Sequence, residues 1–211
     1  MIRPATISDV PYMVRIINNY AERGLMIHRS PAELYERIRD YRIVQLDDGL
    51  VVGVGGLRVL WANWAEVYGL ALAPEARGKG FGKQLVEALI DEARRLAVHN
   101  IFALTYERVF FEHCGFSLVD RRSLPMKVWS ECIRCPKHDN CDEIAVVRQL
   151  DDVPDLGSPL QSTADAVAAS GGTFGAASGG GGVENEDYEN LPIPQVTPAV
   201  LRIDASVRST T

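Results

Sequence analysis

The sequence predicts an α+β domain in which a mixed, twisted central sheet is flanked by helices. Three observations predict this class. Residues 66–97 read as a strand, a glycine-rich turn and an amphipathic helix, whereas residues 42–60 read as an antiparallel hairpin. The apolar run at residues 101–105 is typical of a strand buried among parallel neighbours. Antiparallel and parallel pairings together require a mixed sheet.

Capping signals place the first elements. A short strand is expected at residues 2–5, and Ser8-Asp9 predicts the cap of a first helix that Gly24 ends. Ser30-Pro31-Ala32-Glu33 then starts a second helix with a capping box. The buried stripe of the first helix is expected to comprise Val10, Met13, Ile16, Ile17 and Tyr20.

Period-two alternation assigns the side chains of the central strand, residues 66–73, to two faces. The strand at residues 101–105 should pair with it, and a short helix at residues 109–114 and a strand at 116–120 should follow. One face of the central strand is expected to present Val67, Gly69, Ala71 and Ala73, and the other Glu66, Tyr68, Leu70 and Leu72.

The turn after the central strand holds three glycines, Gly78, Gly80 and Gly82, which can take backbone angles closed to other residues. They precede a helix whose first N–H groups have no helical partner and whose dipole is positive at that end. This arrangement predicts an anion site, and a phosphate is the expected ligand.

Glycine spacing narrows the type of phosphate loop. The stretch fits neither G-x-G-x-x-G nor G-x-x-x-x-G-K-[ST], because Gln84 follows Lys83. It fits Arg-x-x-Gly-x-Gly, beginning at Arg77, and so resembles the coenzyme A pyrophosphate loop of the GNAT superfamily of N-acetyltransferases. A plain glycine-rich turn with solvated basic residues is the alternative interpretation.

A second segment, residues 110–116, supports the resemblance independently. Phe-Phe-Glu-His-Cys-Gly-Phe is similar to the Phe-Tyr-Glu-x-x-Gly-Phe element that packs beside the thioester in that family. The family's frequent tyrosine acid falls at Phe111, whose ring has no proton to give. Either another group protonates the leaving thiolate or it leaves unprotonated.

Further segments resemble the acetyltransferase domain of stand-alone bacterial N-acetylglutamate synthases, over about residues 1–148. They are residues 25–30, 65–67, 103–106 and 124–129. The resemblance implies direct transfer of acetyl from acetyl-CoA to the α-amine of L-glutamate, the first step of arginine biosynthesis. It also implies that the coenzyme binds to Leu70, Ala71, Leu72, Arg77, Gly78, Lys79, Gly80, Phe81, Gly82 and Lys83.

Catalysis needs a neutral amine and therefore a base. Glu66 is the candidate, with Tyr68 on the same face, although Glu66 could instead be a solvated or ion-paired carboxylate. The two carboxylates of glutamate call for arginine partners, and Arg29 and Arg108 are the candidates. For Arg108, a surface charge beside Glu112 is the alternative.

A cysteine-containing element follows at residues 132–143. Cys132, Cys135 and Cys141 could bind zinc, with His138 or the distant Cys114 as the fourth ligand, although the spacing is not that of a standard zinc finger. Simple packing and a redox-sensitive thiol cluster are the alternatives.

Charge and composition set the remaining expectations. The 211 residues carry a net charge of −6, and acidic residues concentrate after residue 150. We therefore expect a near-neutral acetyltransferase domain at residues 1–150 and a disordered, acidic, Gly-rich tail at residues 151–211. There is no basic stripe for nucleic acid, no apolar run for a membrane and no signal peptide, which favours the cytoplasm. Oligomeric state, a homodimer included, is left open.

Two other functions stay open at this point. The chain could acetylate another small amine or amino acid. It could also be a non-catalytic sensor of acyl-CoA, metal or redox state, in which Phe111 marks a lost acid.

Overall fold

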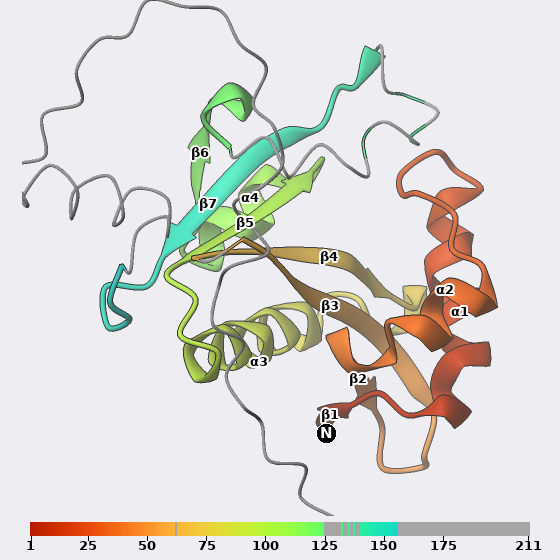
Figure 1. Cartoon of the computed structure of the whole chain (residues 1–211). Helices are drawn as coiled ribbons and strands as arrows, with labels where there is room; N and C mark the ends of the chain where they lie inside the picture. Colours follow the sequence, from red (N-terminus) through yellow and green to blue (C-terminus); the bar gives the residue numbers. More distant parts are fainter. Residues whose placement is uncertain (62, 125–131, 133–134, 136, 138–139, 156–211) are drawn as a thin grey trace, which may run out of the picture. The chain divides into compact units, whose positions relative to one another are not determined.

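The computed structural model of the chain is shown in Figure 1. The described residues are 1–61, 63–124, 132, 135, 137 and 140–155. Apart from residues 151–155, the predicted tail lies outside these residues. None of the described helices is long and apolar enough to cross a membrane.

A sheet of seven strands in the order β1-β2-β3-β4-β5-β7-β6 forms the centre. Its strands are β1 (Ile2–Pro4), β2 (Tyr41–Gln45), β3 (Val51–Trp61), β4 (Trp64–Leu72), β5 (Asn100–Thr105), β6 (Ser117–Val119) and β7 (Ile144–Gln149). Only the β4–β5 pair is parallel among these described strands. The predicted mixed sheet of an α+β fold is therefore confirmed.

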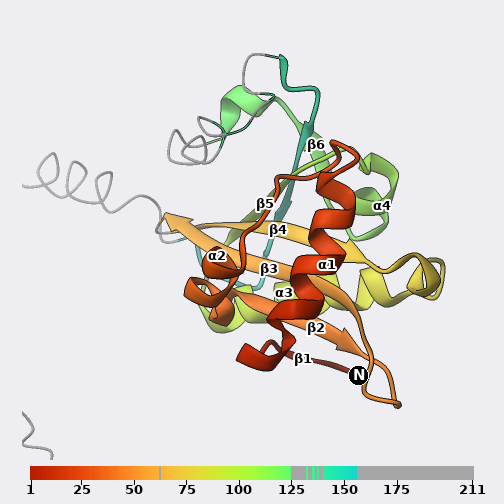
Figure 2. The same ribbon diagram turned by 90° about the vertical axis from the view of Figure 1, so that its right-hand side faces the viewer.

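Helices cover the two faces of this sheet. They are α1 (Val10–Ala21), α2 (Pro31–Glu36), α3 (Phe81–Arg95) and α4 (Arg108–His113), with short 3-10 turns η1 (Ile7–Asp9), η2 (Ile38–Asp40), η3 (Pro74–Ala76) and η4 (Arg121–Ser123). The apolar stripe of α1 packs with Leu34 of α2 on Ile43 and Val54 of the sheet. On the opposite face, α3 and α4 share one hydrophobic cluster with β4, β5 and β7. Figure 2 looks across α1 onto the sheet, with α3 behind it.

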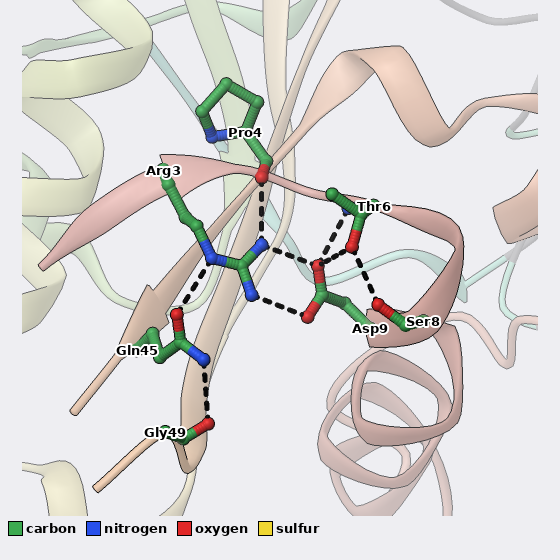
Figure 3. A network of polar contacts seen from close by, with 7 residues as sticks. All are labelled: Arg3, Pro4, Thr6, Ser8, Asp9, Gln45 and Gly49. Carbon is green, nitrogen blue, oxygen red and sulfur yellow. Dashed lines mark hydrogen bonds and ion pairs between the residues drawn. The ribbon is translucent and has the colours of Figure 1, made fainter. Parts of the chain in front are cut away.

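The start of α1 differs from the expected Ser8-Asp9 cap. The helical path begins one turn earlier, at η1, and the carboxylate of Asp9 turns back to accept from the N–H and hydroxyl of Thr6, both at 2.7 Å. Arg3 donates to the two oxygens of the same carboxylate at 2.7 and 2.8 Å (Figure 3). The hydrogen bonds from Arg3 lower the pKa of Asp9 to about 2, although burial of the carboxylate opposes this shift.

A bulge in β4 changes the predicted alternation. Gly56 pairs with Tyr68 and Val54 with Ala71, so two residues of β4, Gly69 and Leu70, stand opposite one of β3. Gly69 has φ = +60°, which favours glycine.

The bulge moves side chains to the opposite faces from those expected. Tyr68 and Ala71 both face α1, whereas Val67 and Leu70 pack in the cluster with α3. The predicted grouping of Tyr68 with Leu70, and of Val67 with Ala71, is wrong because alternation holds only while residues pair one to one.

Beyond Glu66, β4 and β5 separate. Their ladder includes Trp64, Ala65 and Glu66 of β4, and the pair Glu66–Phe102 is its last. Figure 1 shows the two strands diverging beyond this point. The rest of β4 therefore presents an edge to the space between the strands, which is where the candidate site lies.

Strand β7 was not among the predicted elements, yet it lies between β5 and β6. The packing continues past residue 150: Val153 is buried in the α3 cluster, and Asn63 donates to Asp155 at 2.7 Å. The packed part of the chain therefore extends beyond the expected boundary at residue 150.

Candidate active site

A cavity of about 440 Å³ opens where β4 and β5 diverge. Its walls come from the end of α1, the loop before α2, β3, β4, the end of β5, α4 and the cysteine-containing element. The polar and charged side chains on its walls are Tyr20, Arg23, Arg29, Arg58, Glu66, Tyr68, Arg77, Thr105, Tyr106, Glu107, Arg121, Cys132, Cys135, Cys141 and Glu143.

The glycine turn joins this cavity to the N-terminus of α3. Gly78 and Gly80 have φ values of +72° and +79°, as the sequence predicts. The N–H of Gln84 bonds to the carbonyl of Gly80 at 3.1 Å, so the N–H groups before it belong to the open end of the helix. Gly82 is different, because it is helical and needs space: a Cβ there would stand 3.1 Å from the ring of Phe110.

Arg77 links the turn to α1. Its guanidinium donates to the hydroxyl of Tyr20 through Nε at 3.0 Å and through Nη2 at 2.6 Å, and that hydroxyl donates to the carbonyl of Leu72 at 2.6 Å. Lys79 and Lys83 are exposed on the turn, and Phe81 is half-buried. The predicted coenzyme residues therefore lie along one continuous path, from the edge of β4 to the first turn of α3.

Glu66 lies on the cavity wall and forms an ion pair with Arg58. The two residues are direct cross-strand partners on β4 and β3, and each side chain is only 12% exposed. Glu66 is therefore both an ion-paired carboxylate and a carboxylate of the cavity, so the two interpretations offered by the sequence are compatible.

Tyr68 lines the cavity with its ring, over which the guanidinium of Arg58 lies 5.0 Å and that of Arg29 5.9 Å from the centroid. Its hydroxyl donates to Asp40 at 3.0 Å. Burial, together with the neighbouring Tyr41 and Asp40, raises the pKa of Tyr68. The hydroxyl therefore keeps its proton at neutral pH.

The two predicted substrate arginines have different positions. Arg29 is buried on the cavity wall, and its N–H and carbonyl bond to the side-chain amide of Asn18, both at 2.9 Å. Arg108 is exposed on α4, where it pairs with Glu112 at 2.7 Å and is not part of the lining. The structure brings Arg29, and not Arg108, to the cavity.

Phe111 occupies the position where the resemblance expects a tyrosine. Its ring packs edge-on against Phe110 and Phe116, with centroids 5.2 and 5.1 Å apart, and it also reaches the cavity. The cavity wall therefore carries a phenyl ring at the position where the resemblance expects a tyrosine.

Cys132, Cys135 and Cys141 all line the cavity. Cys135 donates from its N–H to the carbonyl of Cys132 at 3.0 Å, and burial raises the pKa of the Cys132 thiol. Within the described residues, no three His, Cys, Asp or Glu side chains come together to hold a metal ion, and His138 lies outside those residues. The zinc prediction thus receives no support.

Five charged residues of the cavity were not predicted as site residues: Arg23, Arg58, Glu107, Arg121 and Glu143. Counting back from the connection between Trp61 and Trp64 would have placed Val59 opposite Glu66, and a register shift between Val59 and Trp61 puts Arg58 there instead. No local signal marks Arg121 or Glu143, because they reach the cavity through the packing of η4 and β7 beside β5.

Comparisons with known proteins agree with this geometry. A model of the acetyltransferase (GNAT) family matches residues 13–116. The chain is 34% identical to an uncharacterised N-acetyltransferase of Chlorobaculum tepidum, with 71% of this chain and 96% of that protein aligned. It is 32% identical to the amino-acid acetyltransferase of Mycobacterium tuberculosis, over 64% of this chain and 78% of that protein.

One solved structure is also similar. It is the N-acetylglutamate synthase of Neisseria gonorrhoeae, complexed with coenzyme A and N-acetyl-glutamate, with a TM-score of 0.65 and 28% identity. The match covers 71% of this chain and 35% of that longer one.

Proposed function

Since the chain belongs to the GNAT family and is an acetyl-CoA-dependent N-acetyltransferase, we propose that its acceptor is the α-amine of L-glutamate. The reaction would yield N-acetyl-L-glutamate and coenzyme A. We place this activity at the start of arginine biosynthesis, in the cytoplasm. The relative named amino-acid acetyltransferase and the neighbour that holds N-acetyl-glutamate support the proposal.

The coenzyme would lie along the exposed edge of β4 and the glycine turn. Backbone N–H groups of Leu70 and Leu72 would bind the thioester carbonyl and the pantetheine arm. The open end of α3 and the basic residues Arg77, Lys79 and Lys83 would hold the pyrophosphate, because both supply donors to an anion.

Arg29 is the observation on which the glutamate assignment depends. Arg29 is buried on the cavity wall, where the side chain of Asn18 holds its backbone. Arg121 lines the same cavity. A guanidinium on the cavity wall is suited to bind a carboxylate, because its planar fork can donate two parallel hydrogen bonds to it. A dicarboxylate that also presents an amine meets these demands, and L-glutamate is such a molecule.

Glu66 is the proposed base. It would take a proton from the acceptor ammonium, directly or through one water, and the neutral amine would attack the thioester carbon. The new C–N bond then forms as the C–S bond breaks, and the proton left on nitrogen passes to the sulfur or to water. No side chain of this protein is acetylated along the way.

The test is thiol release from acetyl-CoA with a panel of amino acids and amines. We expect turnover with L-glutamate and a kcat/KM at least about a thousandfold lower with L-glutamine or L-lysine, whose side chains would leave buried arginines unpaired. Comparable turnover of lysine or polyamines would instead identify a general amine acetyltransferase. Tight coenzyme A binding without turnover of any amine would identify a sensor.

A further inference from the structure

Glu143 is a carboxylate of the cavity for which the reaction above has no role. It directly precedes β7, is half-buried, and lines the same cavity as Glu66. Among the described residues, the thiol of Cys141, 3.9 Å from Oε2, is the one hydrogen-bond donor to its carboxylate, and no ion pair reaches it. A half-buried carboxylate with so weak a donor is costly unless a ligand completes it.

Three carboxylates line the cavity, and Glu107 is the exposed one. The other two differ in how their charge is balanced. Glu66 forms an ion pair with Arg58, whereas Glu143 forms no such pair with a described residue, so its negative charge can act on a ligand in the cavity. Both groups line the same cavity, and burial, followed by the charge of Glu66, raises the pKa of Glu143.

We propose that Glu143 binds the ammonium group of the acceptor, so that it selects a cationic primary amine and holds it beside Glu66. This inference rests on the proposed amine acetylation. Glu143 holds the charged form of the amine, and Glu66 removes the proton. A cation between the two carboxylates also relieves their mutual repulsion.

Other charged groups near Glu143 modulate this role without replacing it. Arg121 and Lys137 lower its pKa, whereas Asp142 raises it. Lys137 itself is engaged with Tyr106 and Asp142, at 3.0 and 3.6 Å. The Cys132 thiol also lies on this wall and stays protonated at neutral pH, because burial raises its pKa.

The experiment compares L-glutamate with glutarate, which has the same two carboxylates but no amine. In Glu143→Gln, we expect the KM for glutamate to rise about 10- to 100-fold, the range for losing a hydrogen bond to a charged group. The inhibition constant of glutarate against glutamate should stay within about twofold, and Glu143→Asp should recover part of the loss. Asp152→Asn removes an exposed carboxylate that pairs with Arg94 and is not part of the lining, and it is the matched control: its KM should remain near wild type.

Equal weakening of glutamate and glutarate would show that Glu143 only supports the wall, and no change in either would show that the ammonium binds elsewhere. Both outcomes overturn the inference while glutamate acetylation stands. If the amino-acid panel identifies a different amine, the same comparison with that amine and its deaminated analogue tests Glu143, because the inference concerns the ammonium.

Discussion

The coenzyme side and the acceptor side of the cavity are built in different ways. The coenzyme side is one continuous stretch of chain, from Tyr68 at the β4 bulge to Gln84 in the first turn of α3. The acceptor side gathers Arg29, Arg58, Arg121 and Glu143 from four separate segments. One side therefore offers local backbone geometry, and the other offers charges that only the tertiary fold brings together.

From this difference we expect the coenzyme side to control binding of the coenzyme and the acceptor side to control rate and specificity. In the proposed complex, backbone donors and glycine angles bind the part of the ligand that is common to the whole family, and this binding should tolerate exchange of exposed side chains. Charged side chains on the acceptor wall form a network in which each group balances another, as Arg58 does with Glu66. A single change there should alter rate or specificity, whereas a single side-chain change on the coenzyme side should have a smaller effect.

The largest effect is expected for Glu66→Gln. Loss of the base should lower kcat about 10²- to 10⁴-fold, most strongly at lower pH, where more of the amine is protonated. Steady-state kinetics across pH would measure it. Glu112→Gln is a control, because Glu112 pairs with the exposed Arg108 outside the cavity lining. A kcat near wild type in Glu66→Gln would show that another group is the base, and the proposed difference between the acceptor side and the coenzyme side would not hold for Glu66.

Arg29→Ala should have the next largest effect. Removing one buried guanidinium should raise the KM for glutamate about 10- to 100-fold, with the KM for acetyl-CoA within about twofold. Arg108→Ala is the matched control, since Arg108 is exposed and not part of the lining, and it should behave like wild type. If Arg108→Ala raised the KM for glutamate and Arg29→Ala did not, the acceptor would bind outside the cavity described above.

Arg77→Ala should have a smaller effect, on coenzyme binding. Arg77 is exposed, so its attraction to the pyrophosphate is screened, and its loss should raise the Kd for acetyl-CoA about three- to tenfold. Calorimetry at low and high salt would measure this, and the difference from wild type should shrink as salt rises. An effect on the KM for glutamate alone would place Arg77 on the acceptor side.

The coenzyme side was the part that sequence could predict. The turn 77–82, its positive φ values at Gly78 and Gly80, and helix α3 all follow from residues adjacent in the chain. The faces of β4 were predicted wrongly, because the bulge at Gly69 depends on its pairing with β3. A glycine within a strand was the available signal, since it often marks a bulge.

The acceptor side could be predicted only in part. Glu66 and Arg29 were recognised from their own segments, but the ion pair of Glu66 with Arg58 depends on hairpin register. Glu143 reaches the cavity because β7 lies between β5 and β6, an order that nothing local to residues 144–149 specifies. Arg108 failed to reach it because the first turn of α4 directs it toward Glu112.

The smallest effect on turnover is expected for a change in a charged pair outside the cavity. This change tests whether charges that support the fold can be separated from charges that bind the substrate. Arg3 and Asp9 form an ion pair at 2.7 Å that joins β1 to η1, and neither residue lines the cavity (Figure 3). Asp9→Asn should leave kcat and KM unchanged while lowering the free energy of unfolding. The pKa of Asp9 falls from 3.8 to about 2 in the folded protein. At 1.36 kcal/mol per unit, this shift corresponds to about 2 kcal/mol.

The sign of its pH dependence follows from the lowered pKa of Asp9. Above about pH 4 the carboxylate is ionised in both folded and unfolded states, and the full stabilisation is present. As the pH falls toward about 2, the folded carboxylate also takes up a proton, and the advantage over Asp9→Asn disappears. Urea unfolding of both proteins at pH 7 and in this acid range would measure the difference. Asp9→Asn could instead change the KM for glutamate without changing stability. That result would mean that a charged pair outside the cavity acts on the acceptor. It would contradict the division between charges that support the fold and charges that bind the substrate.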